Sequence, residues 1–516
     1  MSSTLSRQNA VPLTTGTPTS PSGKVLTLVA AFLGWLFDGF EMGMFPLIGQ
    51  PALKDLLGPT TAPAVISQWF GVIIATFLVG AASGGVLFGW LGDKMGRVRA
   101  MGLSILTYAI FTGLCGFATE AWQITALRFI ASLGMGGEWS LGVALVNEVW
   151  SGKSRAVTAG LIGAAANVGY LLVALLSMVL LSFITTAEHA LSSLGLSQAT
   201  VQYLTDHSAW RLLMISGALP ALLVFTILLF VPESEKWKAE HARGATKHWA
   251  RWDLFGVVYG TVAALVIIWA WSPAAEGKVN LAGAIAITLV GLGIALIGFL
   301  HPVRKYMHRA EAAGTLAPGH GAALIKLMLF GAALSAVALL GTWGSTQWAP
   351  KWVTEKLAPT TEHAKEWTLV WLSVGACVGT MIAALSAGRF GRRITYAALC
   401  VASIGGTLLL YLANHDYNSF FLFSTFLAGT VTASFYGFFP LYLPELLPTA
   451  VRATGQGFAY NFGRIIAAVG GLQTANLMKF FDGSFPKAAS CMSAIYIIGI
   501  VIVWFGPETK GQPLPE

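Results

Sequence analysis

Long apolar runs separated by short polar segments dominate this chain from residue 25 onward. Fourteen runs have helical length, at residues 25–50, 65–90, 100–118, 122–148, 156–183, 210–231, 254–272, 280–300, 325–349, 367–387, 394–413, 419–443, 453–476 and 488–505. Because ~20 apolar residues at ~1.5 Å per residue cross the ~30 Å hydrocarbon layer, runs of this kind can span a bilayer. The pattern predicts an all-α polytopic membrane protein.

The runs group as six, two and six, which predicts two six-helix bundles joined by a central segment. Residues 1–24 are rich in Ser, Thr and Pro and hold no apolar core, so we expect a disordered tail. The predicted divisions are the N-terminal bundle (25–231), a central linker with two additional transmembrane helices (232–324), the C-terminal bundle (325–505) and a second tail (506–516).

Composition excludes an ordinary soluble protein. The chain is 55% hydrophobic and 10% charged, whereas a soluble domain usually has about 25% charged residues. If the N-terminus lies inside and the spans alternate, most of the 31 Lys and Arg fall on the inside. We therefore expect a multi-pass protein of the plasma (inner) membrane with both termini cytoplasmic. The formal charge of +8 then reflects topology, and no nucleic-acid partner is expected.

Two acidic residues, Asp38 and Glu41, lie in the middle of the first run. Three residues apart, they share one helix face. A carboxylate at mid-depth costs at least ~2.5 kcal/mol, so such residues usually mark a watered path for ions or solute. We expect Asp38 and Glu41 to bind and release a driving proton in a transporter. The alternative is a structural ion pair with an Arg of another span.

The fourth run carries Arg128 and, ten residues later, Glu138. A guanidinium stays charged at physiological pH, so Arg128 must face a carboxylate, carbonyl groups or water. Asp38 and Glu41 are its expected partners. Ten residues are nearly three helical turns, so Glu138 is expected to join the same polar seam. We therefore count Arg128 and Glu138 among the proton-coupling residues.

Arg464 is the sole basic residue inside the spans of the second bundle. An Arg can hold a carboxylate through two parallel hydrogen bonds, which makes Arg464 a candidate anchor for an anionic solute. The competing interpretation is an ion pair with Glu148 or Glu41. Neutral donors and acceptors on nearby turns complete the predicted substrate site, namely Asn461, Asn167 and Gln473.

Aromatic residues are abundant, and the 18 Trp include several near span ends. An interfacial belt accounts for most of these. Four aromatic residues could instead line the substrate cavity: Trp35, Trp343, Tyr170 and Tyr436.

Three markers occur twice in the same order, which indicates an internal repeat. GWLGDKMGR (89–97) is matched by the weaker ALSAGRFGR (384–392). Glu148, followed by Arg155-Ala156, is matched by Glu445, followed by Arg452-Ala453. Pro232-Glu233-Ser234 is matched by Pro507-Glu508-Thr509. Parallel six-span repeats around a midplane site are an established transporter plan.

These markers resemble those of the major facilitator superfamily. GWLGDKMGR is similar to its loop signature G-x-L-x-D-x-x-G-R, and PESEKW (232–237) resembles the motif after span six of its sugar porters. DGFE (38–41) is similar to the span-one motif of organic-acid:proton symporters, which often have Asp where this chain has Glu41. GMGGEWSLGVALVNEVW (134–150) resembles span four of the sialate:proton symporters and their monocarboxylate relatives, which also carry two extra central spans.

The resemblance implies alternating access and proton-coupled symport of a small organic acid, either a sialic-acid-like sugar acid or a monocarboxylate. It implies no cofactor apart from the driving proton, a small anionic or sugar-like substrate, and a monomer in the lipid bilayer. It also implies an inner charged ring that gates the cycle: Asp93, Arg97, Glu148, Arg155, Glu233, Arg389, Arg392, Glu445, Arg452 and Glu508.

Other functions stay open. PESEKW favours a neutral sugar or polyol carrier, and fourteen spans also resemble drug:proton antiporters. Span five, AGLIGAAANVGYLLVALL (159–176), lacks the Pro of the antiporter signature, which argues against efflux. The nine His lie outside the predicted spans and there is no HExxH motif, so no enzyme activity and no metal site are expected.

Overall fold

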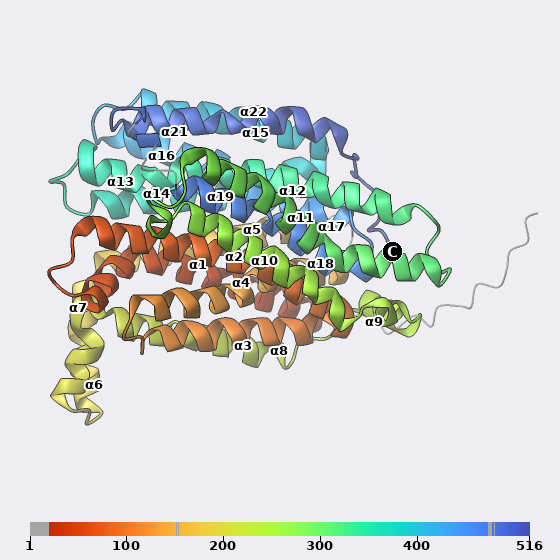
Figure 1. Ribbon diagram of the computed structural model, residues 1–516, viewed down its shortest axis with the longest axis horizontal. Coiled ribbons are helices and arrows are strands. Elements are labelled where there is room, and N and C mark those ends of the chain that lie inside the picture. The colour runs from red at the N-terminus through yellow and green to blue at the C-terminus, as the bar shows by residue number, and fades with distance from the viewer. Residues whose placement is uncertain (1–19, 151, 153, 473–476, 479) are drawn as a thin grey trace, which may run out of the picture.

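In the computed structural model, residues 20–516 are described apart from residues 151, 153, 473–476 and 479. Within these residues the secondary structure is entirely helical. Figure 1 shows the long helices running side by side along the longest axis, with α9 and the C-terminus at one end and α7 and α13 at the other. The predicted all-α polytopic fold is confirmed.

The N-terminal half contains eight helices. Their bounds are α1 (Pro21–Leu57), α2 (Pro63–Met95), α3 (Arg97–Cys115), α4 (Ala121–Val149), α5 (Ser154–Met178), α6 (Leu180–Ser193), α7 (Gln198–Ser216) and α8 (Ala218–Leu228). Shorter helices follow, namely α9 (Glu235–Ala242), η1 (Ala245–His248) and η2 (Arg251–Leu254). The two additional spans are α10 (Phe255–Ala270) and α11 (Leu281–Ala312), which flank η3 (Pro273–Ala275).

The C-terminal half repeats the pattern with more interruptions. Its first elements are α12 (His320–Gly344), η4 (Thr346–Trp348), α13 (Ala349–Trp352), η5 (Val353–Leu357), α14 (Ala364–Phe390) and α15 (Arg392–Leu412). The chain continues through α16 (Ser419–Thr432), α17 (Phe435–Glu445), η6 (Thr449–Val451), α18 (Arg452–Asn461) and α19 (Gly463–Leu472). The last elements are α21 (Phe485–Ser493), α22 (Ile495–Ile502) and η7 (Val503–Phe505).

Among the described residues, twelve of the predicted spans correspond to helices, or to consecutive helices, that are long and apolar enough to cross a membrane. The remaining two are broken into shorter segments. The span at 210–231 falls on α7 and α8, with backbone outside the helical region from Asp206 to Ala209. The span at 453–476 falls on α18 and α19, apart from residues 473–476, which lie outside the described residues.

The predicted tail at 1–24 is too long. Helix α1 begins at Pro21, because the side chain of Ser20 accepts a hydrogen bond from the Gly23 amide at 3.1 Å and Pro21 is suited to the first turn. The part of this tail at residues 1–19 lies outside the described residues. The other predicted divisions of the chain stay predictions.

The helices approach one another closely where glycine removes the side chain. Helices α2 and α4 are an example, because a Cβ atom at Gly136 would lie 1.9 Å from the carbonyl oxygen of Ala81. Such contacts are the usual way in which membrane helices pack. They bring the polar residues of α4 next to those of α1 and α2.

The α10–α11 hairpin contacts both halves of the chain. On α10, the Thr261 hydroxyl donates a 2.7 Å hydrogen bond to the Ser83 hydroxyl of α2. On α11, the ring of Phe299 packs edge-on against Phe462, at the break between α18 and α19, with 6.3 Å between ring centroids. The hairpin therefore covers a seam between the two halves.

Within the hairpin, α10 and α11 meet at Gly298. A Cβ atom there would lie 2.6 Å from the carbonyl oxygen of Gly256 and 2.8 Å from the Cα atom of Gly260. We predict that Gly298→Leu forces the helices apart and lowers stability by roughly 1–3 kcal/mol. Thermal unfolding of the purified protein measures this loss. Gly293→Leu is the matched control, because a Cβ atom there meets nothing within 4 Å; equal unfolding midpoints for both variants would contradict the packing.

Candidate functional site

A cavity with about 1070 Å³ of empty space lies between the two halves. Helices α1, α2 and α5 line it on one side, and α12, α14 and α16 to α19 line it on the other. All four aromatic residues singled out from the sequence line it: Trp35, Tyr170, Trp343 and Tyr436. Their rings give the cavity large apolar faces.

Arg464, on α19, lines this cavity and is almost fully buried. Its Nε and Nη1 atoms have no hydrogen-bond partner among the described residues. Neither expected ion pair forms, because Glu148 binds Arg97 and Arg452 and Glu41 binds Arg128. Within the cavity its guanidinium carbon lies 5.7 Å from the centre of the Tyr460 ring. A buried charge without a countercharge is costly, so this arrangement suits an anionic ligand.

Asp38 and Glu138 form an unusual pair of buried carboxyl groups. All four of their oxygen atoms lack a hydrogen-bond donor among the described residues. Glu138 lies against α1 one turn from Asp38, because a Cβ atom at Gly34 would be 1.7 Å from its Oε1 atom. The Glu138 carboxyl group and the Arg464 guanidinium are both close enough to Asp38 for their charges to act on it. One proton shared between the two carboxyl groups would join one oxygen of each in a hydrogen bond and leave a single negative charge on the pair.

Glu41 and Arg128 form a separate ion pair. The Arg128 Nη1 atom lies 2.5 Å from the Glu41 Oε1 atom, and both side chains are buried. The guanidinium also stacks over the rings of Phe45 and Phe77, at 4.1 and 4.7 Å. Of the two acidic residues in the apolar part of α1, Glu41 therefore has an ion-pair partner, whereas Asp38 has none among the described residues.

The predicted neutral substrate ligands are only partly brought together. Asn167, on α5, lines the cavity. Asn461 does not, because its amide turns toward α4 and donates to the carbonyl oxygens of Gly457 (2.9 Å) and Gly136 (3.4 Å). Arg464, one turn later, lines the cavity instead of Asn461. Gln473 lies outside the described residues.

An aromatic layer forms one wall of the cavity. Trp139 of α4 stacks on Tyr460 of α18 with 3.7 Å between ring centroids, and Trp35 meets Trp139 edge-on at 6.5 Å. The sequence analysis missed Trp139 and Tyr460. Their positions offered a signal, because Trp139 follows Glu138 directly and Tyr460 precedes Arg464 by one turn.

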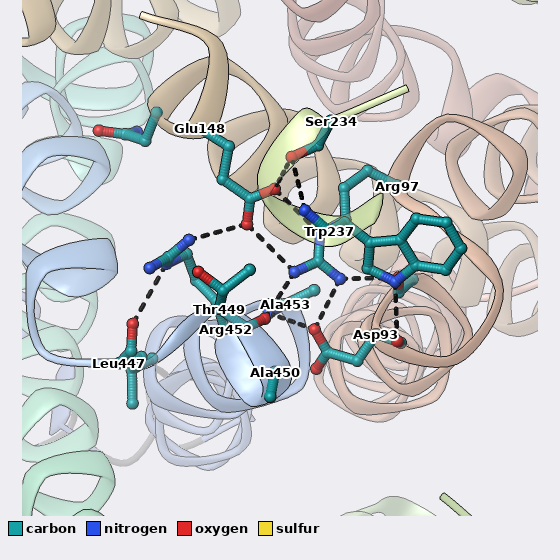
Figure 2. A network of polar contacts seen from close by, with 12 residues as sticks. Asp93, Arg97, Glu148, Ser234, Trp237, Leu447, Thr449, Ala450, Arg452 and Ala453 are labelled. Carbon is teal, nitrogen blue, oxygen red and sulfur yellow. Dashed lines mark hydrogen bonds and ion pairs between the residues drawn. The ribbon is translucent and has the colours of Figure 1, made fainter. Parts of the chain in front are cut away.

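A network of charges joins the two halves at the end of the molecule where α9 lies (Figure 2). Arg97 binds Asp93 at 2.8 Å and Glu148 at 3.1 Å. Glu148 also binds Arg452 of the C-terminal half at 2.8 Å. Asp93 accepts hydrogen bonds from the Ala453 and Thr454 amides, at 3.1 and 2.8 Å. The halves are therefore held together at this end of the cavity.

The second repeat builds a matching set of contacts. Arg392 binds Glu445 at 2.6 Å, as Arg97 binds Glu148. Arg155 of the N-terminal half approaches Glu445 at 3.5 Å, as Arg452 approaches Glu148. The hydroxyls of Thr509 and Ser234 donate to Glu445 and Glu148, respectively. The repeat seen in the sequence therefore recurs in the contacts.

Glu233 and Glu508 cap the N-termini of α3 and α15, the helices that begin at Arg97 and Arg392. Glu233 accepts hydrogen bonds from the Arg97 and Val98 amides at 3.0 and 3.1 Å, and Glu508 accepts one from the Arg392 amide at 2.9 Å. Burial raises the pKa of Glu233 above its usual value. Burial would also raise the pKa of Glu508, but its backbone hydrogen bonds outweigh burial and lower it.

Arg389 does not join this network, contrary to the sequence prediction. Its side chain is exposed, its guanidinium carbon lies 5.6 Å from the Phe390 ring, and it makes no ion pair with a described residue. The reason is its place in the repeat. Arg389 corresponds to Lys94, whereas the position of Asp93 is taken by Gly388.

The arrangement of two six-helix bundles around a central cavity is that of the major facilitator superfamily. The proton:xylose symporter XylE, bound to 6-bromo-6-deoxy-D-glucose, superimposes with a TM-score of 0.67 at 17% identity, covering 96% of this chain and 98% of that chain. Residues 26–254 and 330–511 match the family model "Sugar (and other) transporter". The chain belongs to this family and is a multi-pass membrane transporter, not an enzyme.

Relatives with known names are similar over nearly their whole length. The cis,cis-muconate transport protein of Acinetobacter baylyi is 25% identical, covering 95% of this chain and 95% of that protein. The niacin transporter NiaP of the same species is 24% identical, covering 93% of each chain. The named substrates of these relatives are small organic acids.

Glu148 is the acceptor shared by Arg97 and Arg452, so it should hold the charged end closed. We predict that Glu148→Gln weakens this closure by about 3 kcal/mol, because Arg452 loses its countercharge and Arg97 keeps only Asp93. Spin labels at Arg99→Cys on α3 and Ile394→Cys on α15, in a variant without native Cys, report the separation of the halves. The expected result is a new population at longer distance.

Glu235→Gln is the matched control for this measurement. Glu235 forms an exposed ion pair with Lys238 at 2.9 Å, and such pairs contribute only ~0–1 kcal/mol. Its distance distribution should equal that of the unaltered protein. An unchanged distribution in Glu148→Gln would show that the network does not hold this end closed.

Proposed function

We propose that this transporter couples proton movement to the uptake of a small organic acid by alternating access. The observation that carries the proposal is Arg464, a buried guanidinium that faces a cavity between the halves with two of its nitrogen atoms unpaired. An ionised carboxylate would supply the missing countercharge and accept two parallel hydrogen bonds. The protein acts as a monomer in the plasma membrane, with both termini cytoplasmic.

The cavity favours a flat monocarboxylate over a sugar acid. Trp35, Tyr170, Trp343 and Tyr436 present ring faces, on which a planar or conjugated acid can stack. The name of the niacin relative supports the same class, and that of the muconate relative supports a planar conjugated acid, although muconate carries two carboxylates. A sialic-acid-like sugar acid is the second candidate substrate. The hydroxyl groups of Thr342 and Ser373, which also line the cavity, could bind its hydroxyl groups.

The neutral-sugar carrier is the competing function. It is supported by the likeness to XylE in fold and by the PESEKW motif. A neutral ligand would leave Arg464 without a countercharge, so the geometry favours the acid.

Coupling follows from the electrostatic contact between Arg464 and the Asp38–Glu138 pair. With the cavity empty, negative charge on the pair offsets the charge of Arg464. When an anion binds Arg464, that offset is no longer needed, and the pair gains a proton. Because binding linkage is reciprocal, protonation of the pair favours the loaded state equally. Glu41 and Arg128 stabilise the neighbouring part of α1 during this exchange.

The charged network gates the cytoplasmic side in this proposal. The contacts of Asp93, Arg97, Glu148 and Arg452 close that side, and release of the acid requires them to break. Arg155, Arg392, Glu445 and Glu508 repeat the same device around the second half, and Glu233 supports the first set by capping α3. When these contacts form again, the cavity opens to the outside.

We predict that Asp38→Asn abolishes accumulation of substrate against its gradient, because the amide cannot carry the driving proton. Exchange of labelled for unlabelled substrate should persist, since the cavity and Arg464 are intact. Uptake and counterflow in proteoliposomes separate the two activities. Asp206→Asn, at an exposed position, is the control. Uphill transport by the Asp38→Asn variant would assign the proton to another residue.

Arg464→Lys should weaken acid binding roughly 10- to 100-fold, because Lys keeps the charge but loses the planar pair of donors. Niacin and muconate are suitable probes, with xylose and nicotinamide as uncharged comparisons. Acid-driven uptake of the acids alone is expected. Arg389→Lys, at an exposed position, should behave as the unaltered protein. Equal, pH-independent uptake of an uncharged comparison would favour the sugar carrier instead.

A further inference from the structure

The α10–α11 hairpin carries a groove on the face that points away from the bundles. The hairpin falls in the part of the chain between the two family-matched segments, residues 255–329. The groove holds about 880 Å³ of empty space and is lined almost entirely by apolar groups from both helices. Val262, Val266 and Val290 are 55%, 44% and 62% exposed there. In a bilayer, this groove faces lipid.

Aromatic rings continue the groove toward the end of the molecule that holds the charged network. Tyr259 lines the groove and meets His301 edge-on at 6.3 Å and Phe255 at 5.8 Å. One turn before Phe255, Trp252 is 81% exposed. Exposed aromatic residues of this kind lie at the level of the lipid headgroups. This end of the hairpin therefore lies at the membrane–water interface.

Basic side chains gather at the same level. Arg304 and Lys305 are exposed, and their charges reach His301. Arg251, at the start of η2, is exposed as well. The neighbouring acid, Asp253, is buried and bound by Arg309. Arg251, Arg304 and Lys305 therefore have no ion-pair partner in the part of the chain that the structure describes. The result is an uncompensated positive cluster at the mouth of an apolar groove.

The distance along α11 between the apolar groove and the basic cluster matches the thickness of one leaflet. His301 and Lys305 follow Ile294 on the same face of α11, at steps of seven and four residues. At ~1.5 Å per residue, Lys305 lies ~16 Å along the helix from Ile294, close to half of the ~30 Å hydrocarbon layer. A chain in the groove and a headgroup at the cations can therefore belong to one molecule.

We propose that the hairpin binds an anionic phospholipid of the leaflet on the side of the charged network. One acyl chain lies in the groove between α10 and α11, and the phosphate contacts Arg304, Lys305 and the His301 ring. Basic pockets beside membrane helices suit such headgroups. The site is separate from the cavity of Arg464, so it holds whichever substrate the transporter carries.

Native mass spectrometry of the full chain in mild detergent tests the site, with phosphatidylglycerol and phosphatidylcholine of identical acyl chains as probes. Phosphatidylglycerol should bind more tightly to the unaltered protein. Arg304→Gln/Lys305→Gln should reduce that preference roughly 10- to 30-fold. Ala286→Trp, which fills the exposed groove, should weaken binding of both lipids.

Arg389→Gln/Lys510→Gln is the matched control, because it removes two exposed cations from the same end of the molecule but away from the hairpin. Its preference for phosphatidylglycerol should be unchanged. Equal binding of the two lipids to the unaltered protein, or an equal loss in the control, would overturn the proposal. So would a dimer that Ala286→Trp converts to a monomer, because the groove would then be an interface between two copies.

Discussion

The unpaired charge of Arg464 is the constraint on which the rest of this structure depends. A guanidinium cannot release its proton to escape burial, so it needs either negative charge or water. The bundles provide both, through the central cavity and through the Asp38–Glu138 carboxyl pair whose potential it shares. The carboxylate of a bound acid and the ionised carboxyl pair thus become alternative countercharges for Arg464, so binding of the acid favours uptake of a proton by the pair. This explains how a cavity with largely aromatic walls can couple a solute to a proton gradient.

The charged network solves a different problem with the same chemistry. Its carboxylates are buried but fully supplied with donors, as Glu148 shows by binding two Arg residues and the Ser234 hydroxyl. Satisfied buried charges hold one arrangement of the halves, and they are lost together when the halves separate. The molecule therefore separates its titratable groups by function. The groups at the cavity lack partners and can respond to ligand, whereas those at the charged end have partners and fix the conformation.

Much of the fold could be predicted from the sequence, because hydrophobic length alone identifies a membrane span. Helix breaks could not, since no Pro lies near Phe462, where α18 ends and α19 follows. Part of the candidate site could also be predicted from the hydrophobic pattern. A charge inside an apolar run is conspicuous, so Asp38, Arg128 and Arg464 were identified. The side toward which a polar residue turns is set by its neighbours, so the orientation of Asn461 and the solvated position of Arg389 needed the structure.

Proton uptake on substrate binding tests the central claim most directly. Isothermal titration calorimetry with niacin in two buffers of different ionisation enthalpy gives the number of protons exchanged when the acid binds. If the anion displaces the carboxyl pair as the countercharge of Arg464, about one proton should be taken up per bound molecule near neutral pH. Binding without any exchange of protons would contradict the account, because the anion and the carboxyl pair would then not share the charge of Arg464.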